Sequence, residues 1–278
     1  MKHLTYIFIG MITLLVSACN LEKEIDIDLP DYEGRLFLEC YLEPGQPFTL
    51  LLSRTSPYFE SFPSDTAFLT NILEDGADVS IRINGEEHHL QDELILNPFT
   101  GKLFNYYSLE VVPENYEDDF ELDVTLKDGK KITATTRLLH PVKFDSIQVE
   151  FAKNDTLARV LAFATDDPNT ENYYRRSLHV NSLDSIPIFD FPLDDRASEG
   201  VMVFGSFYDF VKDDKVINTL YTIDKDYFKF LQTIQFAISA NGNPFGQPSP
   251  IYTNLKGDAN AIGIFTGLSY DRVVTKVE

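Results

Sequence analysis

The stretch ADVSIRINGEEHHL, residues 77–90, indicates most clearly which kind of fold this chain forms. Its apolar residues Val79, Ile81 and Ile83 alternate with polar ones, which is the period of a strand with one buried face. The pair Asn84-Gly85 follows, and such a pair is typical of a two-residue hairpin turn because both positions need a positive φ. The stretch therefore predicts two antiparallel strands joined by a tight turn.

A second stretch of the same kind lies further along the chain. FELDVTL, residues 120–126, alternates in the same way, and the turn pair Asp128-Gly129 separates it from KITATTR, residues 131–137. Two tight hairpins with period-2 strands predict an immunoglobulin-like antiparallel β-sandwich over residues 34–140. Pro141 ends its last strand and marks the boundary.

The rest of the chain, residues 141–278, is predicted to form a second β-rich domain with one helix. Short apolar runs separated by turn residues predict its strands. TIDKDYFKFLQTIQFAIS, residues 222–239, is different because its apolar residues recur at helical spacing. Thr222 or Asp224 can cap its start, which predicts a helix near residues 223–239. The expected fold class is thus mainly β.

The start of the chain has the pattern of a secretory signal. Lys2 precedes an uncharged run of 13 residues, 4–16, which is shorter than the roughly 20 residues of a membrane-spanning helix. Val16-Ser17-Ala18-Cys19 resembles a bacterial lipobox, in which the cysteine sulfur is acylated and the chain is cut just before it. We therefore predict a lipoprotein signal peptide over residues 1–18 and lipid attachment at Cys19. The alternative is a plain secretory signal with an incidental cysteine.

Acidic residues dominate the segment behind this cysteine and the chain as a whole. Residues 19–33 hold six carboxylates against Lys23 alone, which predicts an extended acidic tether. This run also resembles the surface-export signal of Bacteroidetes lipoproteins. The whole chain carries 44 acidic and 23 basic residues, for a net charge of −21. Such a surface repels nucleic acid, so we expect no nucleic-acid partner.

Cysteine usage leaves the folded body without a disulfide. With Cys19 taken by the lipid, Cys40 is alone, and it lies in the apolar run LFLECYLE. A small core residue is therefore expected at this position rather than a reactive thiol.

Motifs of catalysis are missing from the sequence. It contains no GxSxG elbow, Walker loop, HExxH or Rossmann glycine pattern, so no enzyme activity and no cofactor are predicted. His88 and His89 suggest a metal site, but neighbours on a strand face opposite sides and do not share a site easily. A polar strand facing solvent is the favoured interpretation, with no metal bound.

Oxygen ligands gather at one turn, formed by Asp166, Asp167, Asn169 and Glu171. Structural calcium is the alternative interpretation of this turn, because calcium takes six to eight oxygen ligands. The spacing does not match that of known calcium loops. An Asx-type turn is therefore the default prediction.

Several aromatic side chains could line a binding face, namely Tyr58, Phe59, Phe62, Tyr106, Tyr107, Tyr173 and Tyr174. Tyr173 and Tyr174 are candidates for a binding or interface surface. The alternative is that such aromatic–polar alternation belongs to core and surface of the β structure.

Three stretches together resemble a known family. They are RLFLECYLEPGQPFTLLLSRT (35–55), ADVSIRING (77–85) and NPFGQPSPIYTNLKGDANAIGIF (243–265). They resemble domain-of-unknown-function family 4249, a family of Bacteroidetes outer-membrane lipoproteins. Asn243, Pro244 and Phe245 open the most specific stretch and are further candidate interface residues. The family's usual glycine pair near the end appears here as Gly257-Asp258.

The resemblance implies a partner rather than a reaction. The family has no established catalytic residues to transfer, and its members are commonly encoded beside TonB-dependent outer-membrane receptors. We therefore expect a non-enzymatic accessory protein of such a transporter, lipid-anchored in the outer membrane at the cell surface, that assists nutrient capture or uptake. A cell-surface adhesion or structural lipoprotein is the alternative. An unrecognised hydrolase would need two facing carboxylates in one cleft.

Overall fold

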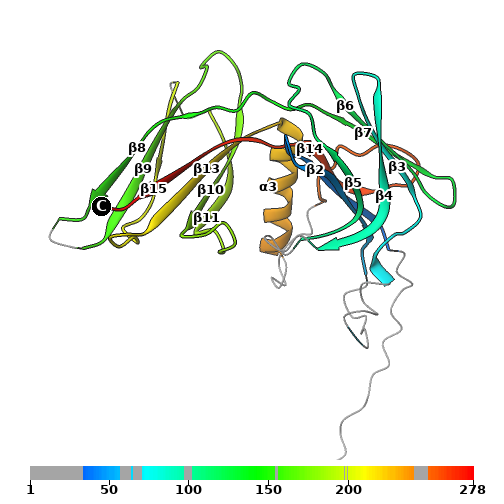
Figure 1. Ribbon diagram of the computed structural model, residues 1–278, viewed down its shortest axis with the longest axis horizontal. Helices are drawn as coiled ribbons and strands as arrows, with labels where there is room; N and C mark the ends of the chain where they lie inside the picture. The colour runs from blue at the N-terminus through cyan, green and yellow to red at the C-terminus, as the bar shows by residue number, and fades with distance from the viewer. Residues whose placement is uncertain are drawn as a thin grey trace, which may run out of the picture. The chain divides into compact units, whose positions relative to one another are not determined.

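The computed structural model describes residues 34–56, 64, 71–96, 102–153, 156–196, 198, 200–240 and 250–278 (Figure 1). The predicted signal peptide, Cys19, the acidic tether and residues 243–245 lie outside the described residues. What the sequence says of them stays a prediction.

Eight strands form the first sheet. In spatial order they are β14 (Ile262–Gly267), β1 (Leu36–Leu42), β2 (Pro47–Arg54), β5 (Leu103–Val111), β4 (Glu86–Leu96), β3 (Asp78–Ile83), β6 (Phe120–Thr125) and β7 (Lys131–Thr136). Both predicted hairpins are confirmed: Asn84 and Gly85 join β3 to β4 with positive φ, and the Asp128-Gly129 turn joins β6 to β7.

The sheet nearly closes on itself. β4 pairs with β3 through its first half and with β5 through its second, and its register with β5 shifts between Asp92 and Ile95. At the far end, Thr133 of β7 forms a bridge with Lys256, a few residues before β14. The two outermost strands, β7 and β14, also contact each other.

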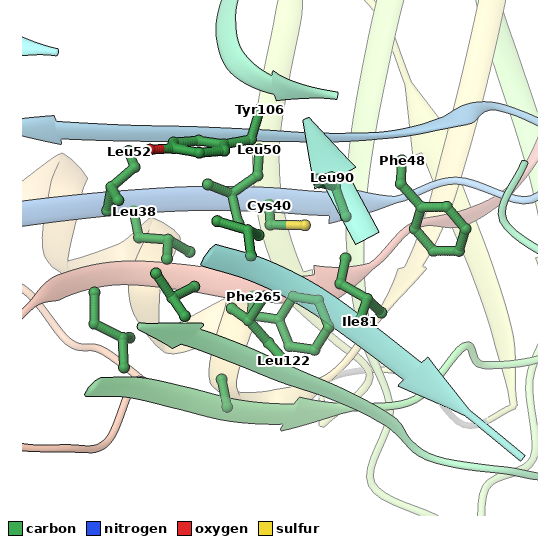
Figure 2. Packing of buried hydrophobic residues seen from close by; sticks show 14 of the residues in the cluster. Leu38, Cys40, Phe48, Leu50, Leu52, Ile81, Leu90, Tyr106, Leu122 and Phe265 are labelled. Carbon is green, nitrogen blue, oxygen red and sulfur yellow. The ribbon is translucent and has the colours of Figure 1, made fainter. Parts of the chain in front are cut away.

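The inner face of this sheet is filled by apolar side chains. On β1, every second residue from Leu36 to Leu42 is buried, as the alternation requires. Figure 2 shows Leu38, Cys40 and Leu50 beside Leu122 and Phe265, which come from strands far apart in the sequence. Cys40 is fully buried and free of a disulfide, which confirms it as a small core residue.

β14 makes the first sheet mixed. It pairs in parallel with β1, from Phe37 opposite Ile262 to Leu42 opposite Gly267. All six of its residues are buried, as expected for a parallel strand covered on both faces. Gly263 has φ +129, and a Cβ there would lie 1.9 Å from the Leu38 carbonyl oxygen, so the close approach of the two strands needs glycine.

This architecture differs from the immunoglobulin-like sandwich predicted for residues 34–140. The strands of that region form one bent sheet with each other and with β14, a strand from the end of the chain. Local alternation predicts which residues form strands, but not which distant strand joins an open edge. The predicted division at residue 140 stays a prediction, although β14 comes from the second predicted domain and pairs in the first.

In the second half of the chain, the strands form two antiparallel sheets that pack against each other. One sheet has the order β11 (Phe189–Asp194), β10 (Tyr173–Val180), β13 (Lys215–Ile223) and β15 (Ser269–Lys276). The other has the order β12 (Val201–Gly205), β9 (Ala158–Thr165) and β8 (Phe144–Phe151). Buried side chains from both sheets pack together, among them Ala162 of β9, Tyr174 of β10 and Leu220 of β13.

The predicted helix is confirmed as α3 (Lys225–Ala240). Asp224 caps it, since its Oδ1 accepts the Tyr227 backbone N–H at 2.6 Å. Tyr227 and Phe230 of α3 pack with Ile264 of β14 and Tyr173 of β10. Within the described part of the chain, no helix combines the length and apolar content that crossing a membrane requires.

Candidate functional site

The two predicted aromatic candidates lie on opposite faces of β10. Tyr174 is fully buried between the two smaller sheets, whereas Tyr173 packs against Phe228 of α3, with ring centroids 4.7 Å apart. Neighbours on a strand alternate between faces, so these two rings do not share a surface. Their role as binding residues stays a prediction.

A different set of aromatic and basic side chains is brought together by the fold. Cross-strand pairing places Arg175 of β10 opposite Tyr221 of β13, and Tyr221 opposite Tyr270 of β15. Directly paired residues share a face, and here that face points away from the three-stranded sheet. We call the set the tyrosine–cation chain, which comprises Lys102, Tyr41, Tyr227, Arg175, Tyr221, Tyr270 and Arg272.

One end of the tyrosine–cation chain joins β1 to α3. Lys102 Nζ lies 4.7 Å from the centre of the Tyr41 ring. Tyr41 points outward from β1 and meets Tyr227 of α3 edge-on, with centroids 5.7 Å apart and an interplanar angle of 65°. Such geometry suits the quadrupoles of aromatic rings and the attraction of a cation to a ring face.

Arg175 lies in the middle of the tyrosine–cation chain. Its Nη1 donates to the Tyr227 hydroxyl at 2.8 Å, and its Nε and Nη2 donate to the two carboxylate oxygens of Asp190 at 2.6 and 2.5 Å. Its Cζ lies 5.5 Å from the centre of the Tyr221 ring. A bidentate carboxylate contact fixes the plane of the guanidinium, so Arg175 connects α3, β10, β11 and β13 rigidly.

The other end reaches β15. The Tyr221 and Tyr270 rings are 5.3 Å apart, and the Arg272 guanidinium lies 4.4 Å from the centre of the Tyr270 ring. Arg272 Nε donates to Thr219 Oγ1 at 2.9 Å. Tyr221, Tyr270 and Arg272 are all partly exposed, so this end is open to a ligand in a way that the fully buried Tyr227 is not.

Burial moves the pKa values of these tyrosines further above neutral pH. It raises the pKa of Tyr227 to about 12 against the opposing effect of Arg175. Burial and the nearby carboxylate of Glu43, which bonds the phenol, raise the pKa of Tyr270 to about 12 as well. Both phenols therefore keep their protons at neutral pH and remain hydrogen-bond donors.

The two adjacent histidines of β4 face opposite sides, as expected. His88 stacks on Phe48 with centroids 4.8 Å apart and bonds Glu110, whereas His89 lies across from Ser80 and is exposed. Among the described residues, no group of three or more histidine, cysteine or acidic side chains is arranged to hold a metal ion.

The acidic turn after β9 is an Asx turn, as predicted. Asp167 Oδ1 accepts the Asn169 backbone N–H at 2.9 Å. Asp166 Oδ1 accepts the Asp167 N–H at 2.8 Å, and Glu171 turns away to pair with Lys225 at 3.0 Å. Protein donors thus occupy one oxygen of Asp166 and one of Asp167, while the second Asp166 oxygen is buried and has no hydrogen-bond partner among the described residues.

Sequence reasoning did not find Arg175 or Arg272. Their only local signal is alternation, since Tyr173, Arg175 and Ser177 share one face of β10. That signal does not show that Tyr221 lies opposite Arg175, or Tyr270 opposite Tyr221, because these pairings join strands that are distant in the sequence.

Comparisons with known proteins identify a family of unknown function. A family model described as "Domain of unknown function (DUF4249)" matches residues 22–273. No curated protein matches the chain.

Proposed function

The chain belongs to the DUF4249 family, and from that premise we propose that it is a lipid-anchored accessory protein of a TonB-dependent transporter. It assists the capture or uptake of a nutrient without catalysing a reaction. Its anchor holds it in the outer membrane, with the body at the cell surface.

One observation carries this proposal: the lipobox-like Val16-Ser17-Ala18-Cys19 directly precedes the acidic run of residues 20–33. Each buried methylene contributes about 0.8 kcal/mol to membrane binding, so two or more acyl chains on the mature N-terminus make a stable anchor. An acidic linker repels itself and stays extended, which suits a body held at a distance from the bilayer.

The described residues give a second reason for the proposed function. The tyrosine–cation chain presents tyrosine and arginine, the residue types that dominate recognition surfaces because they combine apolar area with directed hydrogen bonds. The sequence resemblance implies that members of the family are commonly encoded beside TonB-dependent receptors, and we therefore propose such a receptor as the partner. The net charge of −21 opposes binding to nucleic acid.

Co-purification tests the proposal. The full chain with a C-terminal tag is isolated from membranes in mild detergent, and accompanying proteins are identified by mass spectrometry. We expect an outer-membrane receptor barrel in near-stoichiometric amount, and recovery of the lipoprotein without any barrel would contradict the proposal. Cys19→Ala serves as control, because loss of the anchor should abolish the association.

Growth distinguishes the adhesion alternative. Deletion of the protein should slow growth on a limiting nutrient and leave surface attachment unchanged. A change in attachment with normal growth on every nutrient would favour the adhesion or structural role.

A further inference from the structure

Arg272 is held in place by groups that carry no charge. Its Nε donates to Thr219 Oγ1 at 2.9 Å, and its guanidinium lies on the Tyr270 ring at 4.4 Å. The Tyr221 hydroxyl also lies near the Arg272 guanidinium. Burial raises the pKa of this phenol, and the positive charge of Arg272 lowers it by a smaller amount. The side chain is therefore oriented without a counter-ion.

Carboxylates neutralise most of the other arginines. Those with a salt bridge of 4.0 Å or less are Arg54, Arg82, Arg137, Arg159, Arg175 and Arg196. Arg272 forms none with the residues that the structure describes. The nearby Glu43 bonds the Tyr270 hydroxyl instead. Arg176 also has no carboxylate partner among the described residues, but it is fully buried and its Nη1 and Nη2 donate to the Gly205 carbonyl and to Asn218 Oδ1. Arg272 differs from it because its side chain is partly exposed.

The surroundings of Arg272 favour an anion over a cation. Arg175 and His179 lie on the same sheet face. Two carboxylates lie near them, and both already have partners: Asp190 accepts two hydrogen bonds from Arg175, and Glu43 bonds the Tyr270 hydroxyl. Ser177, Thr219 and Arg272 pair across the three strands β10, β13 and β15, so hydroxyls border the guanidinium. A guanidinium presents parallel N–H donors that match the two oxygens of a planar oxyanion.

We propose that Arg272 is an anion-binding residue that takes the carboxylate or phosphate group of a ligand, with the Tyr221 and Tyr270 rings receiving the apolar part beside it. The fork of the guanidinium supplies charge-assisted hydrogen bonds, and the rings supply contact area at little conformational cost. This assignment rests on the proposed capture role, to which it gives a class of ligand.

Calorimetric titration of the purified full chain in mild detergent tests the assignment. The probes are benzoate and phenyl phosphate, each of which joins a ring to an anion, and benzamide is their neutral counterpart. We expect saturable binding of at least one anion, at least tenfold tighter than benzamide. The better anion tells whether the site takes a carboxylate or a phosphate.

Variants locate the binding. Arg272→Gln should weaken binding of the anion at least tenfold, and Arg272→Lys should weaken it less, because the charge stays while the fork is lost. Arg35→Gln is the matched control, since Arg35 is an exposed arginine that also forms no salt bridge within the described residues. Arg272→Lys keeps the test usable should Arg272→Gln fail to fold.

Three results would overturn the assignment. They are no saturable binding of either anion, equal affinity for benzamide, or unchanged affinity in the folded Arg272 variants. The titration contains no receptor. An absence of anion binding would therefore rule out the anion site without affecting the accessory role, which the receptor co-purification tests separately.

Discussion

The Thr136 hydroxyl donates a hydrogen bond of 3.0 Å to the carboxylate of Asp224, which is 88 positions later in the chain. The same carboxylate oxygen accepts the Thr266 hydroxyl at 3.3 Å, while the other oxygen caps α3. One side chain thus ties the ends of β7 and β14 to the start of the helix. The tie helps to keep α3 against the first sheet, where Tyr227 meets Tyr41.

The pH dependence of stability should report on Asp224. Burial raises the pKa of its carboxyl above the ordinary 3.8, against its hydrogen bonds. The folded protein therefore holds this proton more tightly than the unfolded chain, so the associated stability is present at low pH and is lost as pH rises through the folded pKa.

Asp224→Asn, which cannot ionise, should remove this contribution. The free energy of unfolding of the variant relative to the wild type should increase as pH rises from about 3.8, and urea denaturation at a series of pH values measures it. A difference that falls with pH would contradict the raised pKa.

Asn254 should be important for stability because it covers the outer edge of β14. Its side chain donates to the Phe265 carbonyl at 2.7 Å and accepts the Phe265 N–H at 3.1 Å. Asn254→Ala leaves both backbone groups unpaired and should lower the free energy of unfolding by about 3 kcal/mol. Asn254→Asp keeps the acceptor for the Phe265 N–H but loses the donor. Its free energy of unfolding should lie between those of the wild type and the Ala variant. Unchanged hydrogen exchange at the Phe265 amide in the Ala variant would argue against this role.

Two glycines with positive φ form a matched pair for testing the parallel contact of β1 and β14. Gly263→Ala places a methyl group 1.9 Å from the Leu38 carbonyl oxygen, so we expect a loss above about 4 kcal/mol or failure to fold. Gly45→Ala meets nothing within 4 Å and should lose only about 1 kcal/mol from backbone strain. Equal effects on the thermal midpoint would mean that β14 does not lie where the structure places it.

The local features of this fold could be predicted from sequence because short-range chemistry determines them. Asn84-Gly85 needs positive φ at both positions, and the apolar spacing after Asp224 suits only a helix. The parallel pairing of β14 with β1 could not be predicted, because IGIFTG is largely apolar on both faces and does not indicate which strand it pairs with. Likewise, the alternation around Arg175 predicts which residues share its face of the strand, but it does not predict that Tyr221 pairs with Arg175 or Tyr270 with Tyr221.

The Cys40 thiol should be unreactive in the folded protein. It is fully buried, and burial raises its pKa, so the thiolate that reacts with disulfide reagents is scarce. An aromatic disulfide reagent should label no thiol in the native lipoprotein and one after denaturation. Labelling of a second thiol on denaturation would mean that Cys19 is not acylated.

The most direct test of the central claim is the intact mass of the native protein extracted from membranes. We predict a chain that begins at Cys19 and carries the added mass of its acyl groups. A mass that still includes residues 1–18, or an unmodified amino end at Cys19, would contradict the anchor and with it the proposed place beside an outer-membrane transporter.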